Sequence, residues 1–195
     1  REVIDGLGGV WIDVDEVELQ HINNYQIGIS SVLKTEYNPV KEAGYQLLDG
    51  LQATAYCRIR YGGGDDYKRT ARQREVLKAI EAQAKKTDLA TLTTIFNNCI
   101  GDIYTSIESD DILTLLGSIA DYSIAEEGGF PREDLRTAAN VGAKGSCVIP
   151  VSLEENVEWL HEFLFDDGDY EVTEYVREYG RQIQEDTDKY IRKQP

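Results

Sequence analysis

The chain has 195 residues, of which 20 are basic and 36 acidic, so its formal net charge is −16. This length is enough for one domain with a hydrophobic core, and a content of 41% hydrophobic residues argues against intrinsic disorder. Residues 1–100 hold 12 basic and 14 acidic side chains, whereas residues 101–195 hold 8 and 22. Because the acidic second half repels the phosphates of nucleic acids, DNA binding is not expected.

The cysteines and apolar segments give little sign of a metal site or a membrane span. The sequence has no signal peptide and no apolar run of membrane-spanning length. Cys57, Cys99 and Cys147 lack the spacing of metal ligands. Cys57 lies in an apolar segment and is predicted to be a buried thiol. Cys99 and Cys147 are either a disulfide in an oxidising compartment or two separate buried thiols.

The first 45 residues predict a strand and a helix. Residues 3–14 are predicted to form a turn and then a strand, because Gly8 and Gly9 precede alternating apolar residues. A helix is predicted over residues 15–37 from its apolar positions. The segment "NPVKEAGY", residues 38–45, is predicted to be a loop.

The segment "LLDGLQATAYCRIRY", residues 47–61, leaves two alternatives open. Asp49 caps a short helix over residues 50–57, or residues 53–61 form a strand. In both cases residues 58–60 are predicted to be extended. Arg58 and Arg60 then lie on one side of the chain and Ile59 lies on the other.

The glycines that follow lead into a helix over residues 65–86, with Asp65 or Asp66 as its N-cap. Its predicted buried face consists of Val76, Leu77, Ile80 and Ala84. Further helices are predicted over residues 88–99 and 109–121, followed by a polar excursion over residues 125–145.

The last third predicts one strand and two helices. The strand covers residues 146–151, and a helix over 153–165 is predicted to turn Val157, Leu160 and Leu164 inward. A final helix over 170–193 has the apolar stripe Val172, Val176, Tyr179 and Ile183. Because strands alternate with helices and no linker is evident, the sequence predicts one α/β domain with a layered arrangement.

Basic residues gather in one place. Six of the 20 fall between Arg58 and Arg74, although the chain as a whole is acidic. Arg69, Arg72 and Gln73 are spaced to share one face near a helix N-terminus, where free amide groups favour anions. Because an arginine binds two phosphate oxygens at once, the cluster suits a diphosphate.

An alternative explanation is that these side chains are a solvated face paired with carboxylates of the acidic half. The residues by themselves do not decide between a ligand site and such pairs. Lys68, Arg74 and Lys78 are assigned to the solvated face.

Other motifs that could carry chemistry are incomplete. "YGGGDD" lacks the Gly-Lys-Ser/Thr of a phosphate-binding loop, and "HEFLF" at residue 161 lacks the second histidine of a zinc protease helix. His21 and His161 lie near no pattern for nucleophilic catalysis.

Three segments resemble successive motifs of the LytR-CpsA-Psr (LCP) family of Gram-positive cell envelopes. They are "IDGLGGVWIDV", "LLDGLQATAYCRIR" and "DDYKRTARQREVLKAI". "SCVIPVSLEENVEWLHEFLF" further resembles the closing strand and helix of the family, so the resemblance covers about residues 3–165. Asp65 and Lys68 depart from the family pattern, which has a glycine and often a small residue at these positions.

The resemblance implies a fold and an activity. The fold is a mixed β-sheet layered between α-helices, here without the N-terminal part of the family domain. Residues 1–168 would be the C-terminal portion of the catalytic domain and residues 169–195 a helical extension. The activity is that of a phosphotransferase, which moves a glycopolymer such as teichoic acid or capsule from a polyprenyl diphosphate carrier onto peptidoglycan with Mg²⁺.

The resemblance also implies roles for individual residues. Arg58, Arg60, Arg69 and Gln73 match diphosphate-binding positions, and the helical spacing adds Arg72. Arg58, Arg60 and Asp66 are the predicted catalytic residues. No metal ligand is predicted within the chain, because the Mg²⁺ ligands of the family lie in its first half, which has no counterpart before Arg1.

A membrane anchor upstream of Arg1 is expected as well, which would place the protein on the extracellular face of the cytoplasmic membrane. Two alternatives from other classes remain open. One is a non-catalytic module that binds polyprenyl phosphate or the cell wall. The other is a regulatory protein, the transcriptional attenuator role that is also attached to the family name.

Overall fold

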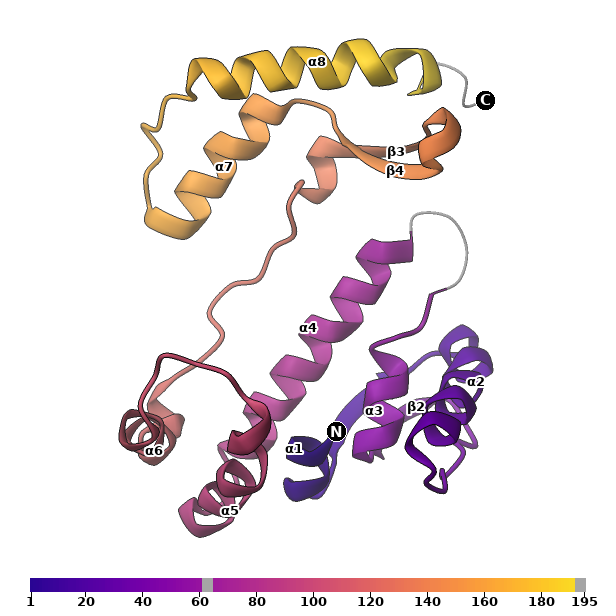
Figure 1. Cartoon of the computed structure of the whole chain (residues 1–195), viewed down its shortest axis with the longest axis vertical. Coiled ribbons are helices and arrows are strands. Elements are labelled where there is room, and N and C mark those ends of the chain that lie inside the picture. Colours follow the sequence, from indigo (N-terminus) through magenta and orange to yellow (C-terminus); the bar gives the residue numbers. More distant parts are fainter. Residues whose placement is uncertain (61–64, 192–195) are drawn as a thin grey trace. The chain divides into compact units, whose positions relative to one another are not determined.

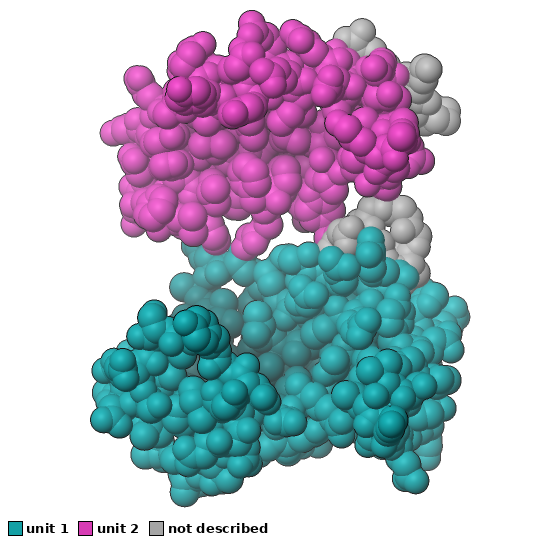
Figure 2. Space-filling model, in the orientation of Figure 1, with its two compact units in different colours: residues 1–61, 68–127 teal, residues 62–67, 128–195 magenta. Residues whose placement is uncertain are grey.

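The computed structural model describes residues 1–60 and 65–191, without the side chains of Asp65 and Asp66. The chain is of the mixed α/β class, as predicted, and its helices accompany two small antiparallel sheets (Figure 1). It divides into two compact units, which we describe separately (Figure 2). Unit 1 comprises residues 1–61 and 68–127, and unit 2 comprises residues 62–67 and 128–195. The sequence marks no linker where this division falls.

Unit 1 contains most of the helices. Its elements are α1 (Glu2–Gly6), β1 (Val10–Val14), α2 (Glu16–Leu33), β2 (Gly44–Leu48), α3 (Gly50–Tyr56), residues 68–84 of α4 (Asp65–Ala84), α5 (Leu89–Cys99) and α6 (Ser109–Gly117). Short 3₁₀ turns follow α5 and α6, at Ile100–Asp102 and Ile119–Asp121. The helices predicted over 65–86 and 88–99 are therefore confirmed, whereas the one predicted over 109–121 is wrong beyond Gly117.

The sheet of unit 1 joins segments that are separated in sequence by α2. β1 and β2 pair antiparallel, with Val10 opposite Leu48 and Val14 opposite Gly44. The side chains of β1 alternate between buried and exposed, which confirms the predicted strand. The loop prediction over 38–45 is wrong at Gly44 and Tyr45, which belong to β2. This segment has no apolar alternation of its own, and it forms a strand because it pairs with β1.

The turn predicted before β1 is partly helical. Residues 2–6 form α1, and the chain then passes through Gly8 and Gly9, which both have positive φ. A Cβ atom on Gly9 would lie 2.9 Å from the carbonyl oxygen of Leu48. Glycine is therefore required here both for the backbone conformation and for the close approach of β2.

Capping boxes fix the starts of α2 and α3. Asp15 Oδ1 accepts from the amide of Glu18 at 2.6 Å, and Glu18 Oε2 accepts from the amide of Asp15 at 3.0 Å. Asp49 and Gln52 exchange the equivalent pair of hydrogen bonds, both at 2.8 Å. Of the two alternatives for residues 47–61, the capped helix is therefore confirmed and the strand is wrong.

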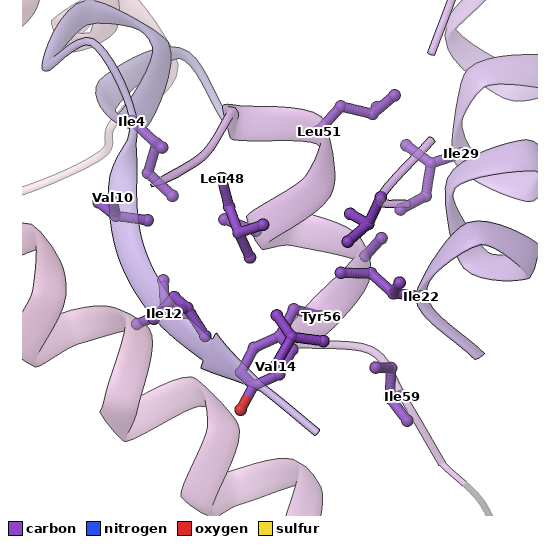
Figure 3. Packing of buried hydrophobic residues seen from close by; sticks show 14 residues of the cluster. Ile4, Val10, Ile12, Val14, Ile22, Ile29, Leu48, Leu51, Tyr56 and Ile59 are labelled. Carbon is purple, nitrogen blue, oxygen red and sulfur yellow. The ribbon is translucent and has the colours of Figure 1, made fainter. Parts of the chain in front are cut away.

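The core of unit 1 lies between β1, β2, α2 and α3 (Figure 3). The largest apolar side chains that are almost fully buried there are Ile12, Ile22, Leu48, Tyr56 and Ile59. On α4, Val76 and Ala84 are buried as predicted, but Leu77 is 56% exposed. The prediction for Leu77 is wrong, because a helical stripe read from sequence cannot show how wide the covered face is.

Unit 2 contains a hairpin and two helices. Its elements are 3₁₀ turns at Glu133–Leu135 and Gly142–Lys144, β3 (Arg136–Asn140), β4 (Ser146–Pro150), α7 (Leu153–Phe165) and α8 (Glu174–Ile191). The strand predicted over 146–151 and the helix over 153–165 are confirmed. β3 was not predicted within the polar segment 125–145, because Ala138 and Ala139 carry a weak strand signal and the partner β4 completes it.

The apolar stripes predicted for α7 and α8 are partly wrong. Leu164 is 56% exposed and Tyr179 is 57% exposed, whereas the core is built from Ala139, Val141 and Ile149 with Ile183 packed against them. α8 begins at Glu174 rather than at residue 170, and residues 192–193 lie outside the described part of the chain. α7 and α8 pack on each other within unit 2. The domain boundary predicted at residue 168 stays a prediction.

Two isoleucines of α2 test the packing of unit 1. Ile22 is fully buried and Ile27 is 49% exposed on the same helix. We expect Ile22→Ala to lower the free energy of unfolding by about 2–5 kcal/mol, because it leaves a cavity in the core. Ile27→Ala is the matched control and should cost less than about 1 kcal/mol. Urea unfolding of both variants measures the difference, and equal losses would contradict this placement of α2.

Candidate functional site

Residues 57–60 carry two of the predicted site arginines. The amide of Arg58 donates to the carbonyl of Ala55 at 3.0 Å, so Arg58 still belongs to the turn that ends α3. Ile59 is completely buried, whereas Arg58 and Arg60 on either side of it are exposed. The predicted alternation of exposed and buried side chains is confirmed, but the extended conformation predicted for residues 58–60 is wrong at Arg58, because the turn that ends α3 continues through this residue. Ile59 anchors the segment in the core.

Arg72 points inward from α4. Its Nε lies 2.6 Å from Glu18 Oε1, and the two side chains are only 5% and 9% exposed. Arg72 Nη1 also donates to the carbonyl oxygen of Ile59 at 3.1 Å. One guanidinium thus joins α2, α4 and the segment that carries Arg58 and Arg60.

Two further side chains hold the same segment. The amide of Arg60 donates to the hydroxyl of Tyr25 at 3.1 Å, and that hydroxyl donates to the carbonyl of Arg60 at 3.4 Å. From α4, Gln73 Nε2 donates to the carbonyl of Cys57 at 3.5 Å. The backbone of residues 57–60 is therefore tied to α2 and α4 at three of its four residues.

The structure brings some of the predicted site residues together. Arg72 and Gln73 both contact the segment of Arg58 and Arg60, and Arg69 lies half-buried one turn earlier on α4. The predicted diphosphate roles of these five residues stay predictions. The side chain of Asp66, the sixth predicted residue, lies outside the described part of the chain.

An apolar cavity of about 600 Å³ adjoins Arg58. Its walls come from α2, mainly from Ile29, Val32 and Leu33, and from Thr54 of α3. Tyr25 and Arg58 also line it. An apolar cavity that is also lined by an arginine suits a ligand with an anionic head and an apolar chain.

A second, more polar cavity of about 450 Å³ lies beside the buried ion pair and is lined by Glu18, Tyr56, Lys68, Arg72, Glu75 and Lys78, among others. The Tyr56 hydroxyl donates to Glu75 Oε2 at 2.7 Å. Burial raises the pKa of Tyr56, and the hydrogen bond to Glu75 raises it further. Burial also raises the pKa of Glu75, and the nearby charges of Glu18 and Asp13 add to the effect. Tyr56 therefore stays a protonated donor in this cavity.

The described residues supply no obvious site for a metal ion. Within residues 1–60 and 65–191, no three histidine, cysteine, aspartate or glutamate side chains lie close enough together to hold one. In the same part of the chain no helix is both long and apolar enough to cross a membrane.

Comparison with known proteins identifies the family. The LytR_cpsA_psr family matches residues 1–127. The chain belongs to this family. The match ends at the last residue of unit 1, so Arg58, Arg60 and both cavities lie in the matched part.

Several solved structures are similar to the chain. A transcriptional regulator from Enterococcus faecalis shares 16% identity over 98% of this chain and 62% of its own, with a TM-score of 0.59, which shows the same fold. TagT bound to LIIa-WTA shares 26% identity over 61% of this chain with a TM-score of 0.44, and the matched part is 40% of the TagT chain. TagT of B. subtilis shares 19% identity over 95% of this chain and 56% of its own, with a TM-score of 0.48. No curated protein matches the chain.

Two residues at the site were not predicted. Both lie on α2, a helix that the sequence motifs do not include: Tyr25 contacts the arginine segment, and Glu18 pairs with Arg72. The Asp15-x-x-Glu18 spacing could have indicated a capping box at the start of α2. Nothing in the sequence indicates that the same carboxylate also pairs with Arg72, 54 residues away.

The thiol of Cys57 should react slowly. Burial raises its pKa to about 11, so at pH 8.5 the reactive thiolate is less than about 1% of the total. We expect alkylation of Cys57 by iodoacetamide to become fast only as the pH approaches 11. Mass spectrometry at several pH values would measure this rate, with N-acetylcysteine as the free-thiol control. Rapid labelling of Cys57, which is half-buried, at pH 8 in the folded protein would contradict the raised pKa.

Proposed function

We propose that this protein is a phosphotransferase of cell-envelope assembly, which moves a glycan from a polyprenyl diphosphate carrier onto peptidoglycan. Membership of the LytR_cpsA_psr family supports a role with cell-wall glycopolymers in general. The observation that carries the finer proposal is the arginine segment. Arg58 and Arg60 are exposed on a backbone held at three points, and Arg58 also lines an apolar cavity.

This arrangement matches both parts of the proposed donor. Guanidinium groups bind phosphate oxygens in pairs, so Arg58 and Arg60 are suited to the diphosphate. The apolar walls of the neighbouring cavity are suited to the first isoprenyl units of the carrier. Arg69 and Gln73 are proposed as further diphosphate ligands because they match family positions beside the same segment.

The proposed reaction is a phosphoryl transfer. A hydroxyl of the acceptor attacks the phosphorus that bears the glycan, and the bond from that phosphorus to the bridging oxygen breaks. The electron pair leaves with polyprenyl phosphate, and the proton of the acceptor hydroxyl passes to the carboxylate of Asp66. Arg58 and Arg60 would stabilise the negative charge that gathers on the phosphate oxygens. Asp66 is the proposed acid–base residue on its motif position alone.

Three other parts of the proposal rest on the family resemblance. They are the requirement for Mg²⁺, the membrane anchor and the location outside the cytoplasmic membrane. The chain spans 40% of the TagT structure bound to LIIa-WTA, so the activity and partners proposed here are those of the whole protein.

A binding role without turnover is the second candidate. Every contact at the described site, from the exposed arginines to the apolar cavity, explains retention of a polyprenyl phosphate or diphosphate as well as its reaction. Incubation of the protein with an LIIa-WTA donor, of the kind bound by TagT, and with peptidoglycan separates the two. Glycan covalently attached to peptidoglycan supports transfer, and a retained but unreacted donor supports binding alone.

Arg58 provides the direct test of the ligand site. We expect Arg58→Ala to weaken binding of geranyl diphosphate at least about tenfold, because the bound anion loses a charged partner. Arg58→Lys should be intermediate, since it keeps the charge and loses the two-pronged geometry. Titration calorimetry measures both affinities, and thermal unfolding confirms that the variants fold.

Arg177 of α8 is the matched control. It is an exposed arginine whose Nη1 lies 3.7 Å from Glu174 Oε2, and it lies more than 100 residues from Arg58 in the sequence. Arg177→Ala should leave the affinity unchanged. If Arg58→Ala and Arg177→Ala had equal and small effects, the diphosphate site would be refuted, and the exposed arginines would serve only as surface charge.

A further inference from the structure

We infer that Glu18 is a positioning residue for the diphosphate site, which acts through Arg72 on the segment that carries Arg58 and Arg60. This inference rests on the function proposed above. It adds a residue that lies outside the arginine motifs and outside the exposed surface of the site. Glu18 need not touch the ligand in order to set where the ligand is bound.

The carboxylate of Glu18 uses both of its oxygens. Oε2 accepts from the amide of Asp15 at 3.0 Å and thereby completes the capping box of α2. Oε1 accepts from Arg72 Nε at 2.6 Å. The residue is only 7% exposed, so its charge is held by these partners rather than by solvent. Because separating a buried pair would leave an uncompensated charge in the interior, Glu18 and Arg72 are held together.

Arg72 connects the carboxylate of Glu18 to the segment that carries Arg58 and Arg60. Arg72 uses Nε for Glu18 and Nη1 for the carbonyl oxygen of Ile59. Because the guanidinium is planar and rigid, fixing one of its nitrogens also fixes the direction of the other. The carbonyl of Ile59 lies between Arg58 and Arg60 in the chain, so the ion pair determines where both exposed side chains begin.

Tyr25 makes the same connection by a shorter route. It lies seven residues after Glu18, on the same face of α2, and its hydroxyl accepts from the amide of Arg60 at 3.1 Å. Helix α2 therefore holds the arginine segment at two points, once directly and once through Arg72. An ion pair that only stabilised the fold would not require Tyr25, on the same helix, to contact residues 58–60 as well.

The consequence for binding is preorganisation. Ordering a loop and its long side chains on binding costs affinity, and a segment that is already fixed avoids this cost. Loss of the Glu18 charge removes the buried carboxylate that Arg72 Nε contacts and lets the carbonyl of Ile59 move. The ligand must then order Arg58 and Arg60 itself.

A double-mutant cycle in the full chain tests this role. Glu18→Gln keeps the shape and the capping-box acceptor but removes the charge, and Glu16→Gln on the same helix turn is the exposed control. We expect Glu18→Gln to weaken binding of geranyl diphosphate about threefold to tenfold, and Glu16→Gln to leave it unchanged. Arg58→Ala should then cost at least about threefold less in the Glu18→Gln background than in the wild type, because coupled residues are not additive.

The outcomes separate the two proposals. If Arg58→Ala has its full effect in both backgrounds, Glu18 does not act through the position of Arg58, and the positioning role is overturned while the ligand site stands. If Arg58→Ala has no effect in the wild type, the proposed function itself fails and takes this inference with it. Should Glu18→Gln not fold, Glu18→Asp replaces it in the same cycle, since it keeps the charge and withdraws the carboxylate by one methylene. A fully additive effect with Glu18→Asp overturns the inference equally.

Discussion

The buried ion pair between Glu18 and Arg72 is the contact on which the candidate site depends. Burying two charges is unfavourable unless their remaining hydrogen-bonding groups are satisfied. Here the second oxygen of Glu18 accepts from the Asp15 amide, and a second nitrogen of Arg72 donates to the Ile59 carbonyl. The pair is thus connected at one end to the start of α2 and at the other to the arginine segment.

The basic residues between positions 58 and 74 of this acidic protein fall into two groups. Arg72 is buried with Glu18, and Arg74 and Lys78 lie 3.7 and 3.1 Å from the carboxylate of Glu127. Arg58 and Arg60 are instead exposed. The ion-paired basic residues and the exposed ones are therefore different members of one cluster, and the exposed pair is the one for which a ligand is proposed.

Local patterns predicted much of the fold. The alternation of β1 predicted a strand that the structure contains, and Asp49 indicated the capped helix that was one of two alternatives for residues 47–61. Both signals act within a few residues. β2 and β3 were missed since their partners lie elsewhere in the chain. The burial predicted for Leu77 was wrong for a similar reason, because the contacts of a helix face depend on tertiary structure.

The candidate site divides in the same way. The alternation of Arg58, Ile59 and Arg60 was correct from sequence, since it depends only on neighbouring residues. The inward direction of Arg72 and its pairing with Glu18 could not be predicted. They require α2 and α4 to come together, and a carboxylate at the third position of a helix is ordinarily exposed.

The role proposed for α2 is to hold Arg72 rigid in the interior so that Arg58 and Arg60 can bind a diphosphate. NMR spectroscopy of the arginine Nε–Hε groups of the full chain, during titration with geranyl diphosphate, can detect this directly. We expect the Hε of Arg72 to exchange slowly with solvent and barely to shift, whereas the signals of Arg58 and Arg60 shift with saturation. Fast exchange at Arg72, or shifts spread over the exposed arginines of α8 with none at Arg58, would contradict it.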